Sequence, residues 1–175
     1  KIINDLLALV KMDKTASDLN ISVVDINELT EIILKRLRPI ARKRDIEVVF
    51  ESIRQVTAEI DEVKMTLIIT NLVENAIKYN REQGRVEVTL DADHQFFILQ
   101  VSDTGIGIPE EAMEHIYERF YRVDKSHSRE IGGTGLGLAI TRSAVLMHRG
   151  SIKLTSVEGE GTTFVVRIPL NYIAS

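Results

Sequence analysis

The chain has 175 residues, of which 44% are hydrophobic and 27% are charged, a length and composition that favour one domain with a single buried core. A net charge of -4 at pH 7 provides no basic surface for nucleic acid, so DNA and RNA are not expected partners. Because the sequence has no cysteine, disulfides, thiolate-bound zinc and a cysteine nucleophile are excluded.

The first predicted element is a short amphipathic helix at residues 2–13, with Ile3, Leu6, Leu7 and Val10 at helical spacing. A helix of this length is marginal in water by itself. It either packs on its own domain or is the end of a longer helix that pairs with another helix.

A second helix is predicted to begin at Asp25 or Asn27, either of which could cap it, and to end near Arg44. Its expected apolar face consists of Leu29, Ile32, Ile33, Leu37 and Ile40. Strands are expected at residues 46–53 and 56–60.

Asp61 is predicted to cap the next helix, which carries the first candidate functional residues. Asn71, Asn75 and Lys78 recur at i, i+4 and i+7, so they share one stripe of this helix. The core stripe beside them consists of Met65, Ile68, Ile69, Leu72 and Ala76.

The second half of the chain is predicted to contain two hairpins and two helices. Strands at residues 86–90 and 96–102 form the first hairpin, and a short helix follows at residues 110–118. A polar, aperiodic loop at residues 123–131 precedes a helix at residues 135–147, for which Gly150 is the expected C-cap. The closing hairpin, residues 151–156 and 162–169, turns at residues 158–161.

These helices and strands do not alternate as strict βαβ units. The pattern therefore predicts a two-layer α/β sandwich, with a mixed, mostly antiparallel sheet and helices on one face.

Two glycine-rich turns, residues 103–109 and 132–138, indicate a nucleotide site. Neither contains Gly-Lys-Ser/Thr or reads G-x-G-x-x-G, which excludes a P-loop and a dinucleotide-binding fold. Gly105 and Gly107 would let the backbone approach a flat ligand, and the Asp103 carboxylate could accept the exocyclic amine of adenine and so select ATP over GTP. The other interpretation of Asp103 is a turn aspartate in an Asx motif.

The second turn opens a helix, where exposed N–H groups and the helix dipole favour phosphate. Gly133, Gly135 and Gly137 would form this cradle, and Thr134 could add a hydroxyl donor. Close helix packing is an alternative reason for Gly137 alone.

Arginines in the aromatic segment between the two turns are further phosphate-binding candidates. Either Arg119 or Arg122 could contact a terminal phosphate through a bidentate guanidinium, although both could instead be solvated surface arginines.

Taken together, residues 71–80 (NLVENAIKYN), 103–109 (DTGIGIP), 118–124 (ERFYRVD) and 132–140 (GGTGLGLAI) resemble the asparagine, first glycine, phenylalanine and second glycine boxes of the ATP-binding catalytic domain of sensor histidine kinases. The resemblance covers roughly residues 22–170. It implies that Asn75 is the Mg²⁺ ligand, that Asn71 and Lys78 face the phosphates, that Tyr79 flanks the nucleotide, and that Arg122 matches the family's arginine better than Arg119.

The expected nucleotide-binding residues are Asn71, Asn75, Lys78, Tyr79, Asp103, Gly105, Gly107, Arg119, Arg122, Gly133, Thr134, Gly135, Leu136 and Gly137. Catalytic roles are expected for Asn71, Lys78 and Arg122.

Two positions in the asparagine box are informative. Asn80 stands where the family usually has serine or threonine, and we expect it to be peripheral, so that Asn80→Ala is nearly silent. Asn71 stands where hydrolytic relatives such as gyrase B and MutL carry a glutamate that activates water, and an asparagine cannot be a general base.

None of the four histidines lies in the His-Glu-Leu-Arg-Thr-Pro-like context of a phosphoacceptor. His94, His115 and His127 fall in a turn, a short helix and the loop, and His148 falls near a helix C-terminus, where a cation is favoured. The resemblance therefore implies transfer of the γ-phosphate of Mg-ATP to a histidine outside this sequence. The alternatives are a hydrolytic ATPase of the same superfamily and a non-catalytic ATP-sensing pseudokinase.

The resemblance also implies a domain organisation and partners. Residues 1–17 would be the remnant of a second dimerisation helix, and residues 18–175 the catalytic domain with a lid at about 123–134. Expected partners are the protein's own dimerisation and histidine phosphotransfer domain and a response regulator, in a protein that is a homodimer at full length. No apolar run approaches the roughly 20 residues that span a bilayer, and the start of the sequence lacks a signal-peptide pattern. The resemblance implies a cytoplasmic domain of a membrane-anchored protein.

Overall fold

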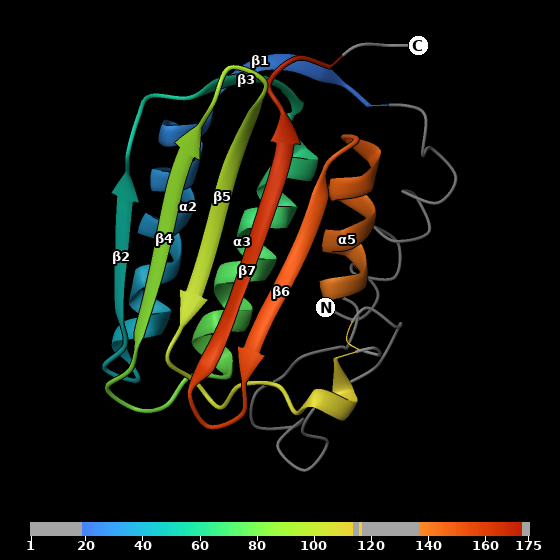
Figure 1. The fold of residues 1–175 in the computed structure, drawn as a ribbon. Coiled ribbons are helices and arrows are strands. Elements are labelled where there is room, and N and C mark those ends of the chain that lie inside the picture. The colour runs from blue at the N-terminus through green and yellow to red at the C-terminus, as the bar shows by residue number, and fades with distance from the viewer. Residues whose placement is uncertain (1–18, 114–115, 117–136, 173–175) are drawn as a thin grey trace, which may run out of the picture.

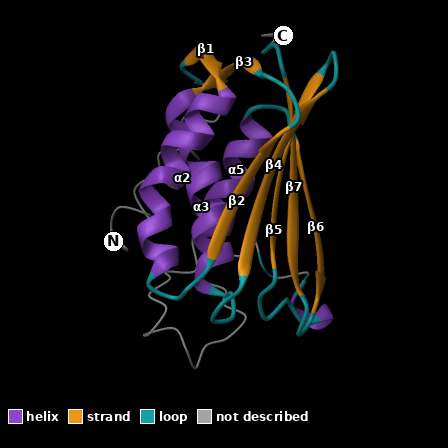
Figure 2. Cartoon of the chain, turned by 90° about the vertical axis from the view of Figure 1, so that its left-hand side faces the viewer, coloured by secondary structure: helices purple, strands orange, loops and turns teal. Residues whose placement is uncertain are grey.

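A computed structural model describes residues 19–113, 116 and 137–172. The described part has two layers, a five-stranded sheet and the helices α2, α3 and α5 on one of its faces (Figures 1 and 2). The predicted α/β sandwich is confirmed. The expected helix at residues 2–13, the lid, Arg119, Arg122 and residues 133–136 lie outside the described residues.

Helix α2 (Ile26–Arg42) is capped by Asp25, one of the two predicted N-cap residues, whose carboxylate accepts a hydrogen bond of 3.0 Å from the Glu28 N–H. Its apolar face differs in part from the prediction. Ile32 and Ile40 are 57% and 47% exposed, whereas Leu34 is fully buried. The buried stripe also includes Ile26, Leu29, Ile33, Leu37 and Ala41.

Helix α3 (Glu62–Lys78) is capped by Asp61, whose carboxylate accepts a hydrogen bond of 3.0 Å from the Lys64 N–H. All five predicted core positions are buried, together with Val73 and Ile77. Because this stripe packs α3 against the sheet, the neighbouring stripe with Asn71, Asn75 and Lys78 is half-buried. Asn71 faces α5 (Gly137–Met147), as its hydrogen bond to Gly137 shows.

The large sheet has the strand order β2-β4-β5-β7-β6. Its strands are β2 (Glu47–Ser52), β4 (Arg85–Ala92), β5 (Phe96–Asp103), β6 (Ser151–Val157) and β7 (Gly161–Pro169). β2 pairs with β4 in parallel, and the other neighbours are antiparallel. Alternate residues of the central strands fill the core beneath the helices, among them Val88, Leu99 and Val166.

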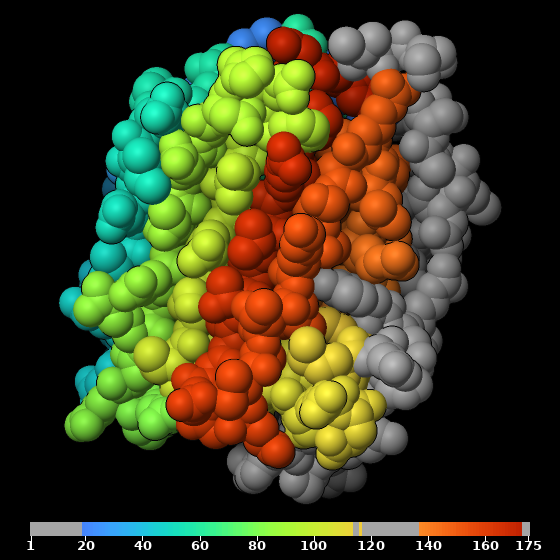
Figure 3. Space-filling view, in the orientation of Figure 1, coloured from blue at the N-terminus to red at the C-terminus, as the bar shows by residue number. Residues whose placement is uncertain are grey.

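No described helix covers the opposite face of the sheet, which forms the surface seen in Figure 3. This face carries polar side chains such as Thr89, Gln100 and Lys153. A solvated outer face explains the alternating pattern of these strands.

A second, smaller sheet was not predicted. β1 (Ile21–Asp25) pairs antiparallel with β3 (Thr57–Asp61). It lies at the end of the molecule opposite the loop that follows β5 (Figure 1). None of the described helices is long and apolar enough to span a membrane.

The C-terminus of α5 corrects the prediction for Gly150. Arg149, not glycine, adopts the left-handed conformation with φ of 63°, and the Gly150 N–H donates to the Val145 carbonyl at 3.0 Å. This is a Schellman motif with an arginine at its left-handed position. Gly150 is needed for a different reason, since a Cβ there would lie 2.5 Å from the Arg167 carbonyl oxygen.

Of the predicted helix at residues 110–118, the structure describes only residues 110–113 and 116. Only a single 3-10 turn, η1 (Glu110–Ala112), follows Pro109. Most of the remaining predicted segment lies outside the described residues.

Candidate functional site

The asparagine helix contacts the end of the second glycine motif. The Asn71 side chain donates from Nδ2 to the Gly137 carbonyl oxygen at 3.2 Å, and a Cβ on Gly137 would lie 3.9 Å from Asn71 Cγ. Gly137 is the first residue of α5 that the structure describes. Two motifs separated by more than sixty residues of sequence therefore meet through one hydrogen bond.

The first glycine motif packs on the C-terminus of α3. The Ile106 N–H donates to the Tyr79 carbonyl oxygen at 3.0 Å. A Cβ on Gly105 would lie 2.3 Å from that oxygen and 2.9 Å from Asp103 Oδ1. Only glycine fits at position 105, and the reason is its packing on Tyr79 and Asp103; the predicted approach of this backbone to a flat ligand stays a prediction.

Gly107 is required for its conformation and for its contact with the β6–β7 hairpin. Its φ is 72°, and a Cβ there would lie 2.2 Å from the Val157 carbonyl oxygen. Gly161, which we expected to be only a turn residue, also packs on this loop, because its Cβ would lie 2.0 Å from the Asp103 carbonyl oxygen. The β6–β7 hairpin therefore packs against the first glycine motif. The sequence did not indicate this contact.

Asp103 forms the Asx contact of the alternative interpretation and is also half-buried. Its Oδ1 accepts a hydrogen bond of 2.8 Å from the Gly105 N–H. Burial raises the pKa of Asp103 to about 6, against the opposing effect of the Gly105 and Thr162 backbone N–H donors. An ionised carboxylate has about four lone-pair sites, so these two donors leave acceptor capacity for a ligand amine.

Asn80 is not peripheral, contrary to the sequence-based expectation. Its side chain is 3% exposed. Nδ2 donates to the Arg85 carbonyl oxygen at 3.0 Å, while Oδ1 accepts from the Arg81 N–H at 2.9 Å and from Thr104 Oγ1 at 3.1 Å. Asn80 therefore joins the end of α3 to the beginning of β4 and to the first glycine motif.

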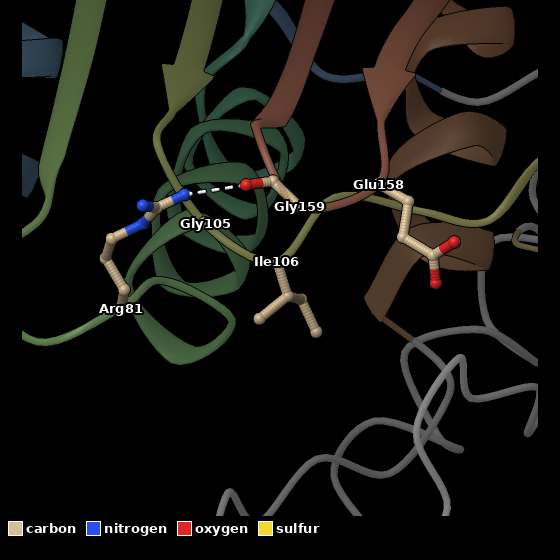
Figure 4. A pocket seen from close by; sticks show the side chains of 5 residues that line it. All are labelled: Arg81, Gly105, Ile106, Glu158 and Gly159. Atoms are coloured by element: carbon tan, nitrogen blue, oxygen red, sulfur yellow. Dashed lines mark hydrogen bonds between the residues drawn. The ribbon is translucent and has the colours of Figure 1, made fainter.

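Arg81 is a second residue that sequence reasoning missed. Its Nη2 donates to the Gly159 carbonyl oxygen at 2.9 Å, and its Nε donates to the Thr104 carbonyl oxygen at 2.6 Å. Figure 4 shows this arginine reaching across Gly105 to the hairpin turn, where the five labelled residues line a shallow pocket. Its position directly after the asparagine box was the only sequence signal.

Asn75, Lys78 and Tyr79 lie half-buried at the end of α3. The Asn75 carboxamide makes no hydrogen bond to any residue that the structure describes, so its oxygen is available to a ligand. Within the described ranges, no group of three or more His, Asp or Glu could hold a metal ion. Mg²⁺ usually takes only one or two protein ligands and completes its shell with phosphates and water, a requirement that Asn75 fits.

His148 corrects the expectation of a cation at a helix C-terminus. It is 2% exposed, Nε2 accepts a hydrogen bond of 3.0 Å from the Asp61 N–H, and Nδ1 lies 2.8 Å from the Ala144 carbonyl oxygen. A ring nitrogen that accepts cannot carry a proton, so Nδ1 is the donor and the ring is neutral. Burial lowers the pKa of His148, outweighing the opposite effects of Ala144 and Asp61.

Comparisons with known proteins identify the family of the chain. Residues 60–172 match the family described as histidine kinase-, DNA gyrase B-, and HSP90-like ATPase. The chain is 40% identical over 176 residues to the sensor protein kinase WalK of Staphylococcus epidermidis, covering 99% of the chain and 28% of the relative. It is 37% identical over 172 residues to the sensor histidine kinase WalK of Bacillus subtilis, covering 97% of the chain and 28% of the relative. The chain thus spans about 28% of the length of these curated relatives.

Solved structures show the same fold. The catalytic domain of the histidine kinase ThkA matches with a TM-score of 0.77 at 28% identity, over 87% of this chain and 97% of that one. Full-length ShkA, solved in complex with AMPPNP, matches with a TM-score of 0.85 at 28% identity, over 99% of this chain and 36% of that one. A third structure, of ThkA in complex with the response regulator TrrA, has a TM-score of 0.75 at 26% identity, over 96% of this chain and 48% of that one.

Proposed function

Because the chain belongs to the histidine kinase-, DNA gyrase B-, and HSP90-like ATPase family, we propose that it binds ATP with Mg²⁺ and serves as the catalytic domain of a two-component sensor histidine kinase. In this role it donates the γ-phosphate to a histidine on a dimerisation helix outside the sequence. Bound Mg²⁺ would neutralise charge on the phosphates. The protein's own contribution is to bind and orient the nucleotide, because phosphoryl transfer needs little covalent chemistry from side chains.

The observation that carries this proposal is the hydrogen bond between Asn71 and Gly137. It joins the asparagine helix to the N-terminus of α5, where free N–H groups favour phosphate. Lys78 lies two turns further along the same stripe of α3 and supplies positive charge on this side. Arg122 and the remaining glycines of the second motif stay predictions, because they lie outside the described residues.

Adenine recognition is assigned to Asp103, at the mouth of the first glycine loop. The half-buried carboxylate accepts the exocyclic amine of the base, and Gly105 keeps the loop packed beside it on the Tyr79 carbonyl oxygen. Guanine presents a carbonyl in the same place, so a buried acceptor would face another acceptor. Asn75 is assigned to Mg²⁺, since its carboxamide oxygen has no partner in the described structure.

The hydrolytic ATPase is the competing enzyme. Asn71 disfavours it, because a carboxamide cannot take a proton from water. The third candidate function is an ATP-sensing pseudokinase. Because a pseudokinase also binds nucleotide, only a measurement of phosphoryl transfer distinguishes it from the kinase.

The proposal extends to the whole protein. Residues 1–17 belong to a dimerisation helix, residues 18–175 form the catalytic domain, and a response regulator receives the phosphate from the acceptor histidine. The full-length protein is a homodimer at the membrane, with this domain in the cytoplasm. The structure of ThkA in complex with a response regulator supports the regulator as a partner class.

Calorimetry with Mg-ATP and Mg-GTP tests the binding assignments. We expect Asp103→Ala to lose the preference for ATP and Asn75→Ala to weaken ATP binding in Mg²⁺ but to have much less effect in excess chelator. Asn20→Ala is the control, because Asn20 is exposed and only its backbone N–H, not its carboxamide, bonds to another described residue. Equal affinities of the wild type for the two nucleotides would refute the adenine assignment.

A further inference from the structure

Arg44 lies in the turn between α2 and β2, where hydrogen bonds fix its backbone. The Ile46 N–H donates to the Ala41 carbonyl oxygen at 3.0 Å across Asp45, which has a φ of 56°. The carbonyl oxygen of Arg44 accepts from the Gln83 N–H at 3.2 Å. The side chain therefore leaves from a rigid point beside the end of α3. Figure 1 places this turn, the end of α3 and the loop after β5 at the same end of the molecule.

The Arg44 guanidinium binds the C-terminal end of α3. Nη1 donates to the carbonyl oxygens of Ile77 at 2.5 Å and Lys78 at 2.9 Å, and Nη2 donates to the carbonyl oxygen of Asn80. Nε lies 3.4 Å from the Glu82 carboxylate. The last carbonyls of a helix have no partner within the helix and carry partial negative charge, so a cation is stabilising there.

The carbonyl that Arg44 does not contact belongs to Tyr79, and it binds the first glycine loop. The Ile106 N–H donates to it at 3.0 Å, and Gly105 passes so close that a Cβ would lie 2.3 Å from the same oxygen. Carbonyls 77, 78 and 80 are thus held by Arg44, and carbonyl 79 is held by the loop. The position of the loop depends on the conformation of this last turn.

We propose that Arg44 is a positioning residue for the nucleotide site, acting through the last turn of α3. It sets the placement of Lys78 and Tyr79 and, through the Tyr79 carbonyl, the placement of the Gly105–Ile106 loop beside Asp103. Arg44 touches no nucleotide-binding side chain assigned above: its contacts are to three backbone oxygens and to the Glu82 carboxylate. The inference rests on the proposed function for the meaning of the site, but the coupling from Arg44 to the loop can be measured without nucleotide.

Arginine is needed because the contacts spread over three carbonyls and one carboxylate. A planar guanidinium presents five donors in a fixed fork, whereas a lysine ammonium is a point charge that cannot bridge the same set. Arg44→Lys keeps the charge and removes the fork. It should therefore give a partial defect, between the wild type and Arg44→Gln.

The experiment compares the wild type, Arg44→Lys, Arg44→Gln and a control, Asp25→Ala. The control removes the N-cap of α2 at the opposite end of the helix, so it lowers stability without touching the end of α3. Amide hydrogen exchange by NMR without nucleotide measures the Ile106 N–H, and calorimetry measures the affinity for Mg-ATP under conditions where all four proteins are folded.

We expect Arg44→Gln to speed exchange at Ile106 by roughly five- to tenfold relative to exchange in the β6–β7 ladder, with a smaller change in Asp25→Ala. The affinity of Arg44→Gln for Mg-ATP should fall by roughly tenfold. The exchange rate and the affinity of Arg44→Lys should lie between those of the wild type and Arg44→Gln. Unchanged exchange at Ile106 in Arg44→Gln would overturn the inference whatever the nucleotide result. Equal losses of ATP affinity in Arg44→Gln and Asp25→Ala would also overturn it, since the effect would then be general destabilisation. A wild type that binds no ATP, with exchange at Ile106 still faster in Arg44→Gln, would contradict the proposed function while upholding the coupling.

Discussion

The carboxylate of Asp103 accepts a hydrogen bond of 2.8 Å from the Gly105 N–H inside a turn whose burial raises the pKa of Asp103 to about 6. The side chain that shapes the glycine loop therefore begins to take up a proton just below neutral pH. A ligand amine that donates to the carboxylate would stabilise the ionised form and release the proton.

The first prediction is that affinity for the adenine nucleotide rises with pH up to about 6 and is constant above about 7. Below pH 6 the free protein holds a proton that binding must displace, which costs up to about tenfold in affinity per pH unit. Calorimetry from pH 5 to 8 measures this dependence. Asp103→Asn corrects for titration of the phosphates, because it removes only the carboxyl; parallel profiles for the two proteins would contradict the prediction.

A second prediction concerns His148, which is buried and neutral between Asp61 and Ala144. Its pKa is lowered in the folded state, mainly by burial, so the unfolded chain binds the proton more readily. The neutral His148 ring therefore contributes to the free energy of unfolding above the unfolded pKa of about 6.5. This contribution is lost as the pH falls below that value.

Urea denaturation at pH 5 to 7.5 measures this loss in the wild type against His148→Asn, which should be less stable throughout but less dependent on pH. Asp103 acts in the opposite direction, because its raised pKa makes protonation near pH 6 stabilising. Asp103→Asn is therefore needed beside His148→Asn to separate the two effects. An equally steep pH dependence in His148→Asn would show that another group is responsible.

Asn80 provides a third prediction, one that reverses the sequence-based expectation. Asn80→Ala removes the donor to the Arg85 carbonyl oxygen and the acceptor for the Arg81 N–H and the Thr104 hydroxyl. Because these buried groups then lose a partner, the variant should lose about 1–3 kcal/mol of unfolding free energy. Asn80→Ser retains a hydroxyl and should cost less. Asn20→Ala, at an exposed position, is the control, and a loss in Asn80→Ala no larger than in this control would disprove the structural role.

Gly105→Ala should reduce nucleotide affinity far more than Gly159→Ala. The first substitution places a methyl group 2.3 Å from the Tyr79 carbonyl oxygen, so the loop must move. At Gly159 nothing lies within 4 Å of a Cβ, and only its φ of 85° is unfavourable to alanine. Affinities for Mg-ATP, measured together with the melting temperatures of both variants, test the contrast. Similar affinities would mean that the approach of the backbone at Gly105 is irrelevant to binding.

Local signals explain what the sequence predicted correctly. Asp25 and Asp61 cap the helices that follow them, and the apolar stripe of α3 has the expected period, because each of these features depends on residues within one or two turns. β1 was missed because its five residues gain their hydrogen bonds from β3, more than thirty residues away. The left-handed residue after α5 was assigned to Gly150 on propensity, whereas packing against β7 requires glycine there and places Arg149 in the left-handed conformation.

Within the site, the residue types that could contact a ligand were predictable, and the residues that support them were not. Asp103, Gly105 and Asn71 belong to motifs, and the structure brings Asn71 to Gly137 as the paired motifs suggested. Asn80, Arg81 and Arg44 bind backbone carbonyls or amides of other elements. Such contacts leave no pattern in one sequence, because the partner is a backbone atom that any residue could supply.

The most direct test of the proposed kinase function is γ-labelled ATP, incubated with this chain in the presence and absence of a separate dimerisation hairpin that carries an acceptor histidine. Alone, the chain should neither label itself nor hydrolyse ATP rapidly, because Asn71 cannot activate water. With the hairpin, label should appear on its histidine, slowly because the effective concentration given by tethering is lost. Rapid hydrolysis by the chain alone, or no transfer to the histidine despite tight binding of Mg-ATP, would contradict the assignment as a histidine kinase catalytic domain.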